Sequence, residues 1–319
     1  MRKMQRYRMR KLLALLLCAA FVLLCAACGI PAVDPDRVSV VATLFPQYDI
    51  ARSIAGDRAD VTLLLDFGVD AHSYDPTPAD LVRIARADLF IYTGDGMEMW
   101  AAKLLQSADV QKAIESGSLS VLDLSQHAEL VCTHDHAHDH GEHDHGEYDP
   151  HIWTSIGNAE RMSLAIADAL TAIDVSGREE YRVNCKAYCA SLHSLAAEYR
   201  MLSPRLDTGY FGGSFAFAYL FDELGLHHMS VFEGCASHAE ASAGDISAIV
   251  TAMRESGAKY VLYDSPAEEK IARTVAAETG AELLRLHAIH NISKAEFDAG
   301  ETYFSLMAAN LETLRKALN

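Results

Sequence analysis

Hydrophobic residues along this chain gather in short runs that alternate with longer segments of mixed polarity, and this alternation occurs twice. Short apolar runs predict buried strands, whereas apolar residues three or four positions apart predict helices. In the first half the predicted strands are Val38–Leu44, Val61–Leu65, Leu89–Tyr92 and Leu119–Leu124, and the predicted helices are Tyr48–Ala55, Pro78–Ala87 and Met97–Ala108. Strands that alternate with helices in this way predict a parallel sheet covered by helices.

The same alternation resumes after residue 205. The predicted strands there are Gly209–Phe211, Met229–Phe232, Tyr260–Tyr263 and Leu283–Leu286, and the predicted helices are Phe215–Leu224, Asp245–Ser256, Glu268–Thr279 and Gly300–Leu318. Between the halves, the pattern predicts a helix that begins at its N-cap Asn158 and ends at Ile173. A break at Asp174–Gly177 separates it from a second helix, Glu179–Leu202, which would be about 36 Å long.

The expected fold class is therefore α/β, with two parallel-sheet (β/α) lobes joined by a long linker helix. Ligands of such sheets bind beyond the carboxyl ends of the strands, so a ligand is expected in a cleft between the lobes. The predicted divisions of the chain are a signal peptide at 1–27, a tether at 28–36, an N-terminal lobe at 37–155, linker helices at 156–203 and a C-terminal lobe at 204–319.

The N-terminal segment has the order of a secretory signal. Residues 1–27 carry six basic residues and no acidic one, and the uncharged stretch Leu12–Ala27 is shorter than the roughly 20 apolar residues of a membrane-spanning helix. The segment ends Leu24-Cys-Ala-Ala-Cys28-Gly, which resembles a bacterial lipobox and predicts a lipid on Cys28. The lipobox usually has Leu where Cys25 stands, and ordinary cleavage with an unmodified Cys28 is the alternative.

Acidic residues outnumber basic residues by 44 to 27, which gives a formal charge of −17 over 319 residues. Affinity for nucleic acid comes mainly from Lys and Arg, so this balance argues against a nucleic-acid partner and favours the attraction of cations. The seven cysteines include no CxxC pair, so a cysteine zinc site is not indicated. Cys185 and Cys189 lie four residues apart on one predicted helix face, where they are expected to be buried.

Six of the fifteen histidines fall within one segment of twelve residues, here called the histidine tract. Its members are His134, His136, His138, His140, His143 and His145. The tract has no apolar residue larger than Ala, so it predicts a flexible loop. Its imidazoles and interleaved carboxylates favour weak binding of zinc, nickel or copper without fixed geometry.

Four other histidines stand where the cleft is expected. They are His72 in Gly68-Val-Asp-Ala-His-Ser-Tyr, His151 in Asp149-Pro-His-Ile-Trp-Thr, and His287 and His290 in Leu286-His-Ala-Ile-His-Asn. Asp70 and Asp149 each precede a histidine by two residues, and either carboxylate could orient an imidazole by accepting its hydrogen bond.

These motifs, in this order, resemble the metal-binding lipoproteins of bacterial ABC importers for zinc and manganese, the cluster A-I solute-binding proteins. The Gly68–Pro78 segment is similar to the family motif Gly-x-x-Pro-His-x-Tyr-x-Pro-x-Pro, and Asp149–Thr154 nearly repeats a second family motif. Tyr303–Leu318 is similar to the last helix of the family, and a histidine tract before the second motif is typical of its zinc branch. The resemblance implies a buried metal between two lobes.

The resemblance also implies a ligand set. The first two family ligands carry over to His72 and His151, and the fourth aligns with His287. The third stands two residues before an Ala-Phe-x-Tyr segment, and here that position is Ser214, a poor zinc ligand. The candidates are therefore His72, His151, His287 and His290, with Asp264 and Glu240 as weaker ones. Three imidazoles and one further donor favour tetrahedral Zn²⁺ over Mn²⁺, which prefers carboxylates and water.

The expected function is the extracytoplasmic component of an ABC importer, which captures Zn²⁺ and delivers it to a membrane permease and its ATPase. The protein is expected to be a lipid-anchored or periplasmic monomer and not an enzyme. One alternative is a manganese-specific protein of the same family. Two others are a surface adhesin and a zinc hydrolase, since three histidines with an open position also form a catalytic arrangement.

Overall fold

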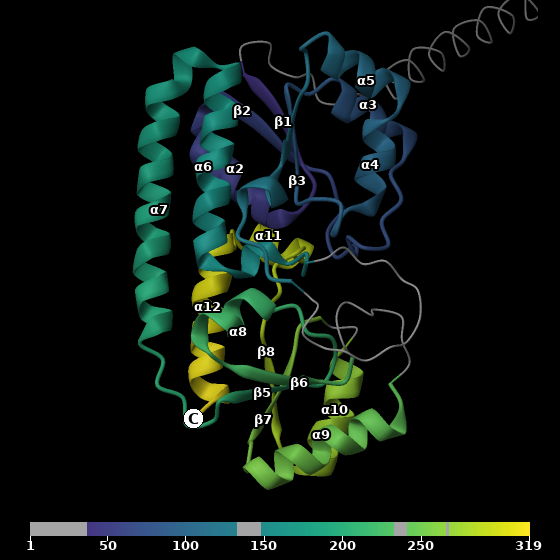
Figure 1. Ribbon diagram of the computed structural model, residues 1–319, viewed down its shortest axis with the longest axis vertical. Coiled ribbons are helices and arrows are strands. Elements are labelled where there is room, and N and C mark those ends of the chain that lie inside the picture. The colour runs from purple at the N-terminus through teal and green to yellow at the C-terminus, as the bar shows by residue number, and fades with distance from the viewer. Residues whose placement is uncertain (1–36, 133–147, 233–240, 266–267) are drawn as a thin grey trace, which may run out of the picture. The chain divides into compact units, whose positions relative to one another are not determined.

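The computed structural model describes residues 37–132, 148–232, 241–265 and 268–319 (Figure 1). The signal peptide, the tether with Cys28, the histidine tract, Cys235 and Glu240 lie outside the described residues. The first sheet is parallel, with strand order β2-β1-β3-β4. Its strands are β1 (Val38–Ala42), β2 (Ala59–Leu63), β3 (Leu89–Tyr92) and β4 (Ser120–Asp123), and the helices between them are α2 (Phe45–Ala55), α3 (Pro78–Ala85), α4 (Met99–Leu105) and α5 (Ala108–Glu115).

A second parallel sheet, with strand order β6-β5-β7-β8, repeats this arrangement later in the chain. Its strands are β5 (Thr208–Phe211), β6 (His227–Ser230), β7 (Tyr260–Tyr263) and β8 (Glu282–Arg285), and its helices are α8 (Ala218–Leu224), α9 (Ala243–Ser256), α10 (Glu269–Thr279), α11 (Lys294–Asp298) and α12 (Tyr303–Ala317). The two sheets confirm the predicted α/β fold of two parallel lobes. The residue boundaries of the lobes stay a prediction.

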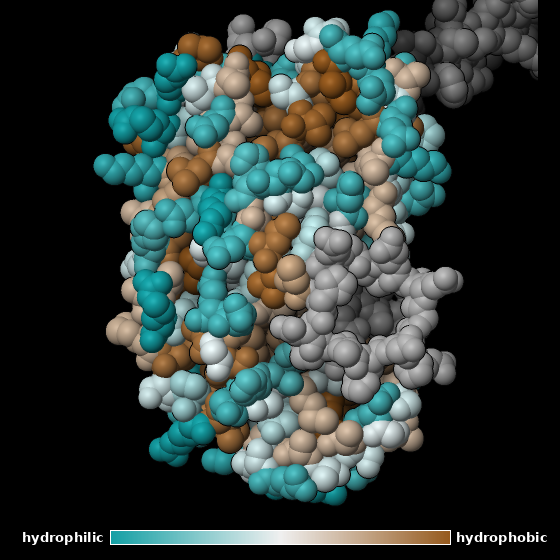
Figure 2. Space-filling view, viewed as in Figure 1, coloured by the Kyte–Doolittle hydropathy of each residue, from teal (hydrophilic) through white to brown (hydrophobic). Residues whose placement is uncertain are grey.

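Two long helices join the sheets along the chain. Helices α6 (Ile156–Ile173) and α7 (Arg178–Arg200) lie side by side, and the short turn Val175–Gly177 separates them at the predicted break (Figure 1). Helix α7 buries a stripe of apolar residues that includes Tyr181 and Leu192, and Figure 2 shows mainly hydrophilic residues along its visible side. None of the described helices is long and apolar enough to cross a membrane.

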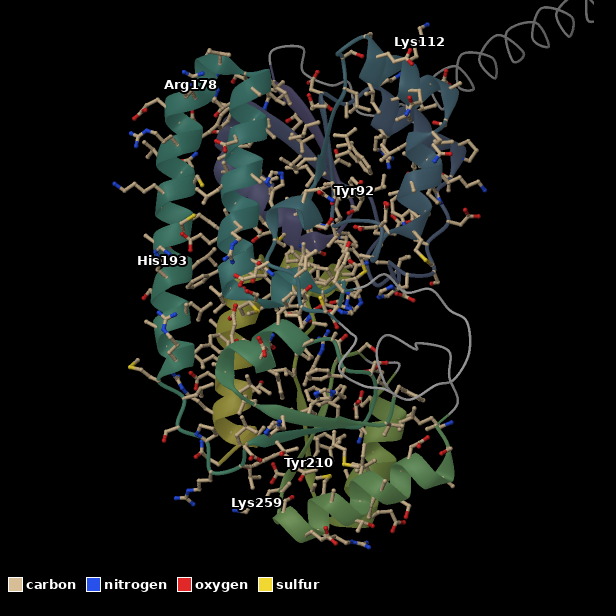
Figure 3. All side chains as sticks on the ribbon, viewed as in Figure 1. Tyr92, Lys112, Arg178, His193, Tyr210 and Lys259 are labelled. Atoms are coloured by element: carbon tan, nitrogen blue, oxygen red, sulfur yellow. The ribbon has the colours of Figure 1, made fainter. Side chains whose placement is uncertain are left out.

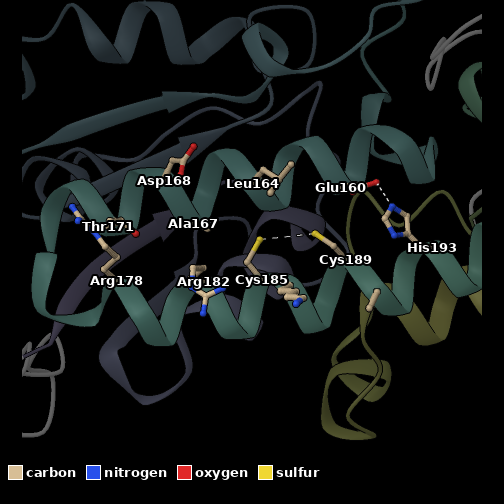
Figure 4. A pocket seen from close by; sticks show the side chains of 12 residues that line it. Glu160, Leu164, Ala167, Asp168, Thr171, Arg178, Arg182, Cys185, Cys189 and His193 are labelled. Atoms are coloured by element: carbon tan, nitrogen blue, oxygen red, sulfur yellow. Dashed lines mark hydrogen bonds and ion pairs between the residues drawn. The ribbon is translucent and has the colours of Figure 1, made fainter.

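A groove of about 780 Å³ runs between α6 and α7 (Figure 4). Cys185 and Cys189 line it with their Sγ atoms 3.9 Å apart, and both are buried free thiols. Near one end of the groove, His193 Nε2 lies 2.8 Å from Glu160 Oε2. The two thiols thus occupy one helix face as small buried side chains, which is the arrangement that their spacing predicts.

Two local predictions are corrected by the structure. The predicted helix Met97–Ala108 is replaced by the separate helices α4 and α5, because Ser107 between them is extended (φ −67°, ψ 145°). The N-cap of α6 is Ser155 and not Asn158, since the Ser155 hydroxyl accepts a hydrogen bond from the Asn158 N–H at 2.9 Å. The Asn158 side chain bonds the backbone of Glu129 instead.

Buried hydrogen bonds hold the segment before α6 against the end of the chain. The indole Nε1 of Trp153 donates to the carbonyl oxygen of Ala288 at 2.7 Å, and the Tyr303 hydroxyl donates to the carbonyl oxygen of Trp153 at 2.6 Å. The backbone N–H of Tyr303 donates to Asp49 Oδ2 in α2 at 2.8 Å. All four residues are buried, and Figure 3 shows many polar side chains gathered between the two sheets.

Replacing Trp153 with Phe is expected to lower the free energy of unfolding by about 2–4 kcal/mol. The substitution leaves the buried Ala288 carbonyl without its donor and removes ring volume from a packed site. Trp100→Phe is the matched control, because the Trp100 Nε1 has no hydrogen-bond partner among the described residues. Urea unfolding followed by circular dichroism measures both variants. Equal losses for the two would show that the indole hydrogen bond contributes nothing.

Candidate metal centre

The candidate ligands follow strands of both sheets. His72 lies in the loop between β2 and α3, and His151 directly precedes the single turn Ile152–Thr154. Asp264 directly follows β7, and His287 and His290 follow β8. The carboxyl ends of parallel strands lie at one edge of a sheet, and the loops there commonly carry binding residues.

His151 is held by the aspartate two residues before it. Its backbone N–H donates to Asp149 Oδ1 at 2.8 Å, and its ring Nδ1 lies 2.9 Å from the same oxygen. Burial alone would raise the pKa of Asp149, but the charge and hydrogen bonds of His151 outweigh it and hold that pKa below its ordinary value. The structure thus shows the orienting contact that the spacing suggested, and it leaves Nε2 as the nitrogen suited to a metal.

His72 and His151 lie next to each other. Their ring centroids are 5.7 Å apart with the planes inclined by 62°. Asp70 Oδ1 accepts a hydrogen bond from the backbone N–H of His72 at 3.1 Å, and Asp70 Oδ2 accepts one from the Ser73 hydroxyl. Burial opposes ionisation of Asp70, but the hydrogen bond and charge of His72, with a smaller contribution from His290, lower its pKa. His290 therefore stands close to this pair.

His290 reaches the same junction from the second sheet. Its Nδ1 lies 3.9 Å from Asp264 Oδ2, while Asp264 Oδ1 accepts a hydrogen bond from the Ala288 N–H at 2.7 Å. The pKa of His290 lies below its ordinary value. Burial lowers it most, the charge of Asp264 opposes this, and the charge of His151 lowers it further. The structure thus places His290 beside Asp264, where the charges of His151 and Asp70 also act on it.

His287 has a different environment. Its Nδ1 accepts a hydrogen bond from the Ile289 N–H at 2.9 Å, and its Nε2 lies 3.5 Å from Glu296 Oε1 in α11. Burial lowers the pKa of His287 to about 4. One ring nitrogen thus accepts a hydrogen bond from the backbone, while the buried Nε2 has no hydrogen-bond partner among the described residues, so His287 stays a candidate ligand beside His290. Ile289 between the two histidines has a φ of 65°, which is rare for a β-branched residue.

Ser214, at the position of the third family ligand, lies just after β5. Its backbone N–H donates to Glu268 Oε1 at 2.9 Å, and the Asp264 N–H donates to Glu268 Oε2 at 3.3 Å. The pKa of Glu268 lies above its ordinary value. Burial raises it most, the Ser214 hydrogen bond opposes this, and the charge of Asp264 raises it further. Glu268 carries no sequence motif and stands 54 residues from Ser214, so only the fold reveals the contact.

In the described parts of the chain, no three His, Cys, Asp or Glu side chains already stand at the distances of a formed metal site. The remaining weak candidate, Glu240, lies outside the described residues, as does the histidine tract.

This chain is similar to known zinc-uptake proteins. The profile of a family described as the periplasmic component A of zinc-uptake complexes, ZnuA, matches residues 40–317. The high-affinity zinc uptake system protein ZnuA of Bacillus subtilis strain 168 is 32% identical over 316 residues, which cover 97% of this chain and 98% of that protein.

Solved structures share the fold. The Zn(II)-bound ZnuA-like domain of Streptococcus pneumoniae AdcA matches with a TM-score of 0.74 and 26% identity, over 88% of this chain and 99% of that domain. This chain spans 61% of the length of the AdcA lipoprotein from the R6 strain. The laminin-binding protein Lmb of Streptococcus agalactiae, described as a bifunctional adhesin and metal transporter, matches with a TM-score of 0.73 and 26% identity over 88% of this chain and 100% of Lmb. Because the family profile covers nearly all of the described residues, this chain belongs to the ZnuA family of periplasmic zinc-uptake components.

Proposed function

We propose that this protein captures Zn²⁺ at the junction of its two lobes and delivers it to a membrane permease driven by an ATPase. The observation that carries the proposal is the contact of the His72 and His151 rings, with centroids 5.7 Å apart, in a chain of the ZnuA family. Imidazole-rich sites suit zinc, whereas manganese prefers carboxylates and water. The transport role of the family supports a binding protein without enzymatic activity.

The ligand set that the geometry supports best is His72, His151 and His290 with one carboxylate. His287 is proposed to shape the loop through its hydrogen bond from the Ile289 N–H rather than to bind the ion. The gathered side chains are not yet at coordination distance, so loading includes their rotation or a closer approach of the lobes. The histidine tract is proposed to collect zinc weakly beside this site, since it directly precedes the Asp149–Thr154 motif.

Two alanine variants test whether His290 or His287 is the zinc ligand. His290→Ala is expected to lower zinc affinity about 100-fold or more, while His287→Ala changes it less than about 10-fold, because Nδ1 of His287 is already held by the Ile289 N–H whereas His290 faces the Asp264 carboxylate. Competition against a strong chelator resolves this tight ion from ions held weakly by the tract. Circular dichroism without metal controls for folding. Loss of the tight ion in His287→Ala alone would restore His287 as the ligand.

Zinc affinity is expected to fall steeply as the pH drops through about 6. Neutral imidazole is the form that binds metal, and protons compete for it near an ordinary pKa of about 6.5. Burial lowers the pKa of His290, so this ring stays neutral, and available to zinc, to a lower pH than a free imidazole. Chelator competition from pH 7.5 to 5 measures the slope of log affinity, which should approach the number of histidine ligands. A flat response would indicate a carboxylate site and favour manganese.

The lipid anchor is proposed from the Ala-Ala-Cys28-Gly junction. Cys28→Ala is expected to release the protein from the membrane fraction, because the acyl chains would be lost with the thiol that carries them. Fractionation of cells that express the full chain measures this. A protein that still needs detergent for extraction would show that residues 12–27 are a retained membrane anchor.

Adhesion is a second candidate function. It is favoured by the likeness to Lmb, which is described as both adhesin and metal transporter. Zinc capture stays the first proposal because the described residues supply a physical basis for it.

A further inference from the structure

Ser214 occupies the third ligand position of the family site and has no imidazole, but the carboxylate of Glu268 lies beside it. Glu268 Oε1 lies 2.9 Å from the backbone nitrogen of Ser214. Its other oxygen, Oε2, lies 3.3 Å from the backbone nitrogen of Asp264. Asp264 in turn approaches His290 to 3.9 Å. The Glu268 carboxylate is therefore linked, contact by contact, to the gathered histidines.

The local packing makes room for Glu268 at this place. A Cβ atom on Gly213 would lie 2.5 Å from Glu268 Cδ and Oε2, so any larger residue at 213 would displace the carboxylate. A Cβ atom on Gly212 would lie 2.3 Å from Ala272 Cα in α10. The pair of glycines therefore lets α10 pack against the end of β5 and brings Glu268, just before α10, to Ser214.

The hydrogen bonds of Glu268 hold its side chain in place but do not use all the lone-pair positions of its carboxylate oxygens. A carboxylate has about four lone-pair positions, and the amide groups of Ser214 and Asp264 use one on each oxygen. These donors are neutral amides, the Ser214 hydroxyl that also bonds the carboxylate is neutral too, and no Lys or Arg in the described residues pairs with Glu268 within hydrogen-bond distance. The carboxylate thus has no cationic side chain beside it and keeps an oxygen position for a cation.

We propose that Glu268 replaces the imidazole missing at Ser214 and supplies the carboxylate oxygen of the zinc site, together with His72, His151 and His290. This inference rests on the proposed zinc capture. Three imidazoles and one carboxylate oxygen complete a tetrahedral zinc environment, with the Zn–O distance expected at about 2.0–2.2 Å. Asp264 then acts as a positioning residue that faces Nδ1 of His290 and turns Nε2 toward the ion.

The test compares two neighbouring glutamates in the full mature chain. Glu268→Gln keeps the size and one oxygen acceptor of the side chain, and it is expected to raise the zinc dissociation constant about 10- to 100-fold. Glu269→Gln is the matched control, because Glu269 pairs with Arg273 on α10, and its zinc affinity should be unchanged. Thermal unfolding without metal shows whether each variant is folded.

A rescue variant separates ligation from packing. Ser214→His combined with Glu268→Gln returns an imidazole to the third corner and is expected to regain zinc affinity. X-ray absorption at the zinc edge should count three imidazoles in the wild-type protein and four in this double variant. Four imidazoles in the wild-type protein would overturn the inference even if Glu268→Gln fails to fold.

The outcomes also distinguish this inference from the proposed function. If Glu268→Gln binds zinc like the wild-type protein while His151→Ala does not, zinc capture stands and the role of Glu268 is wrong. If His151→Ala also retains the tight ion, the junction is not the zinc site, and both proposals are wrong.

Discussion

The segment that follows β8 belongs to the second sheet in sequence, but several of its hydrogen bonds run to the first lobe. The Asn291 side-chain amide donates to the carbonyl oxygens of Asp66 and Val69 at 2.8 Å each. The Gly68 N–H donates to the Ile292 carbonyl at 3.2 Å, and the Phe45 N–H donates to the His290 carbonyl at 3.3 Å. Because buried backbone groups must find partners, this segment fixes the loop that bears His72 against the loop that bears His290.

Two aspartate carboxylates contact imidazole rings near this segment. Asp149 holds Nδ1 of His151, and Asp264 faces Nδ1 of His290. The Asp149 contact, at 2.9 Å, is the carboxylate–histidine pairing usual for a metal-binding histidine, whereas Asp264 approaches His290 only to 3.9 Å. Burial lowers the pKa of His290 and so favours the neutral form that binds metal. Orientation and protonation state are therefore both set by the protein before an ion arrives.

The sequence predicts most of the fold because buried strands are short, continuous apolar runs. Strands β3 and β7 have the predicted bounds for this reason. Helix α5 was not predicted, since nothing in the sequence marks Ser107 as extended. The different environments of His287 and His290 depend on the backbone turn at Ile289, which periodicity does not reveal. The contact of Glu268 with Ser214 was not predicted, because it depends on the packing of α10 against two glycines far away in the chain.

The left-handed turn at Ile289 carries an energetic cost that the surrounding structure has to offset. A β-branched residue with a φ of 65° costs on the order of 1–3 kcal/mol. The carbonyl oxygen of Ala288 before it accepts a hydrogen bond from Trp153, and the side chain of Asn291 after it donates to the Asp66 carbonyl oxygen. The turn is thus held by partners outside its own loop, so the backbone between the two histidines depends on residues far away in the chain.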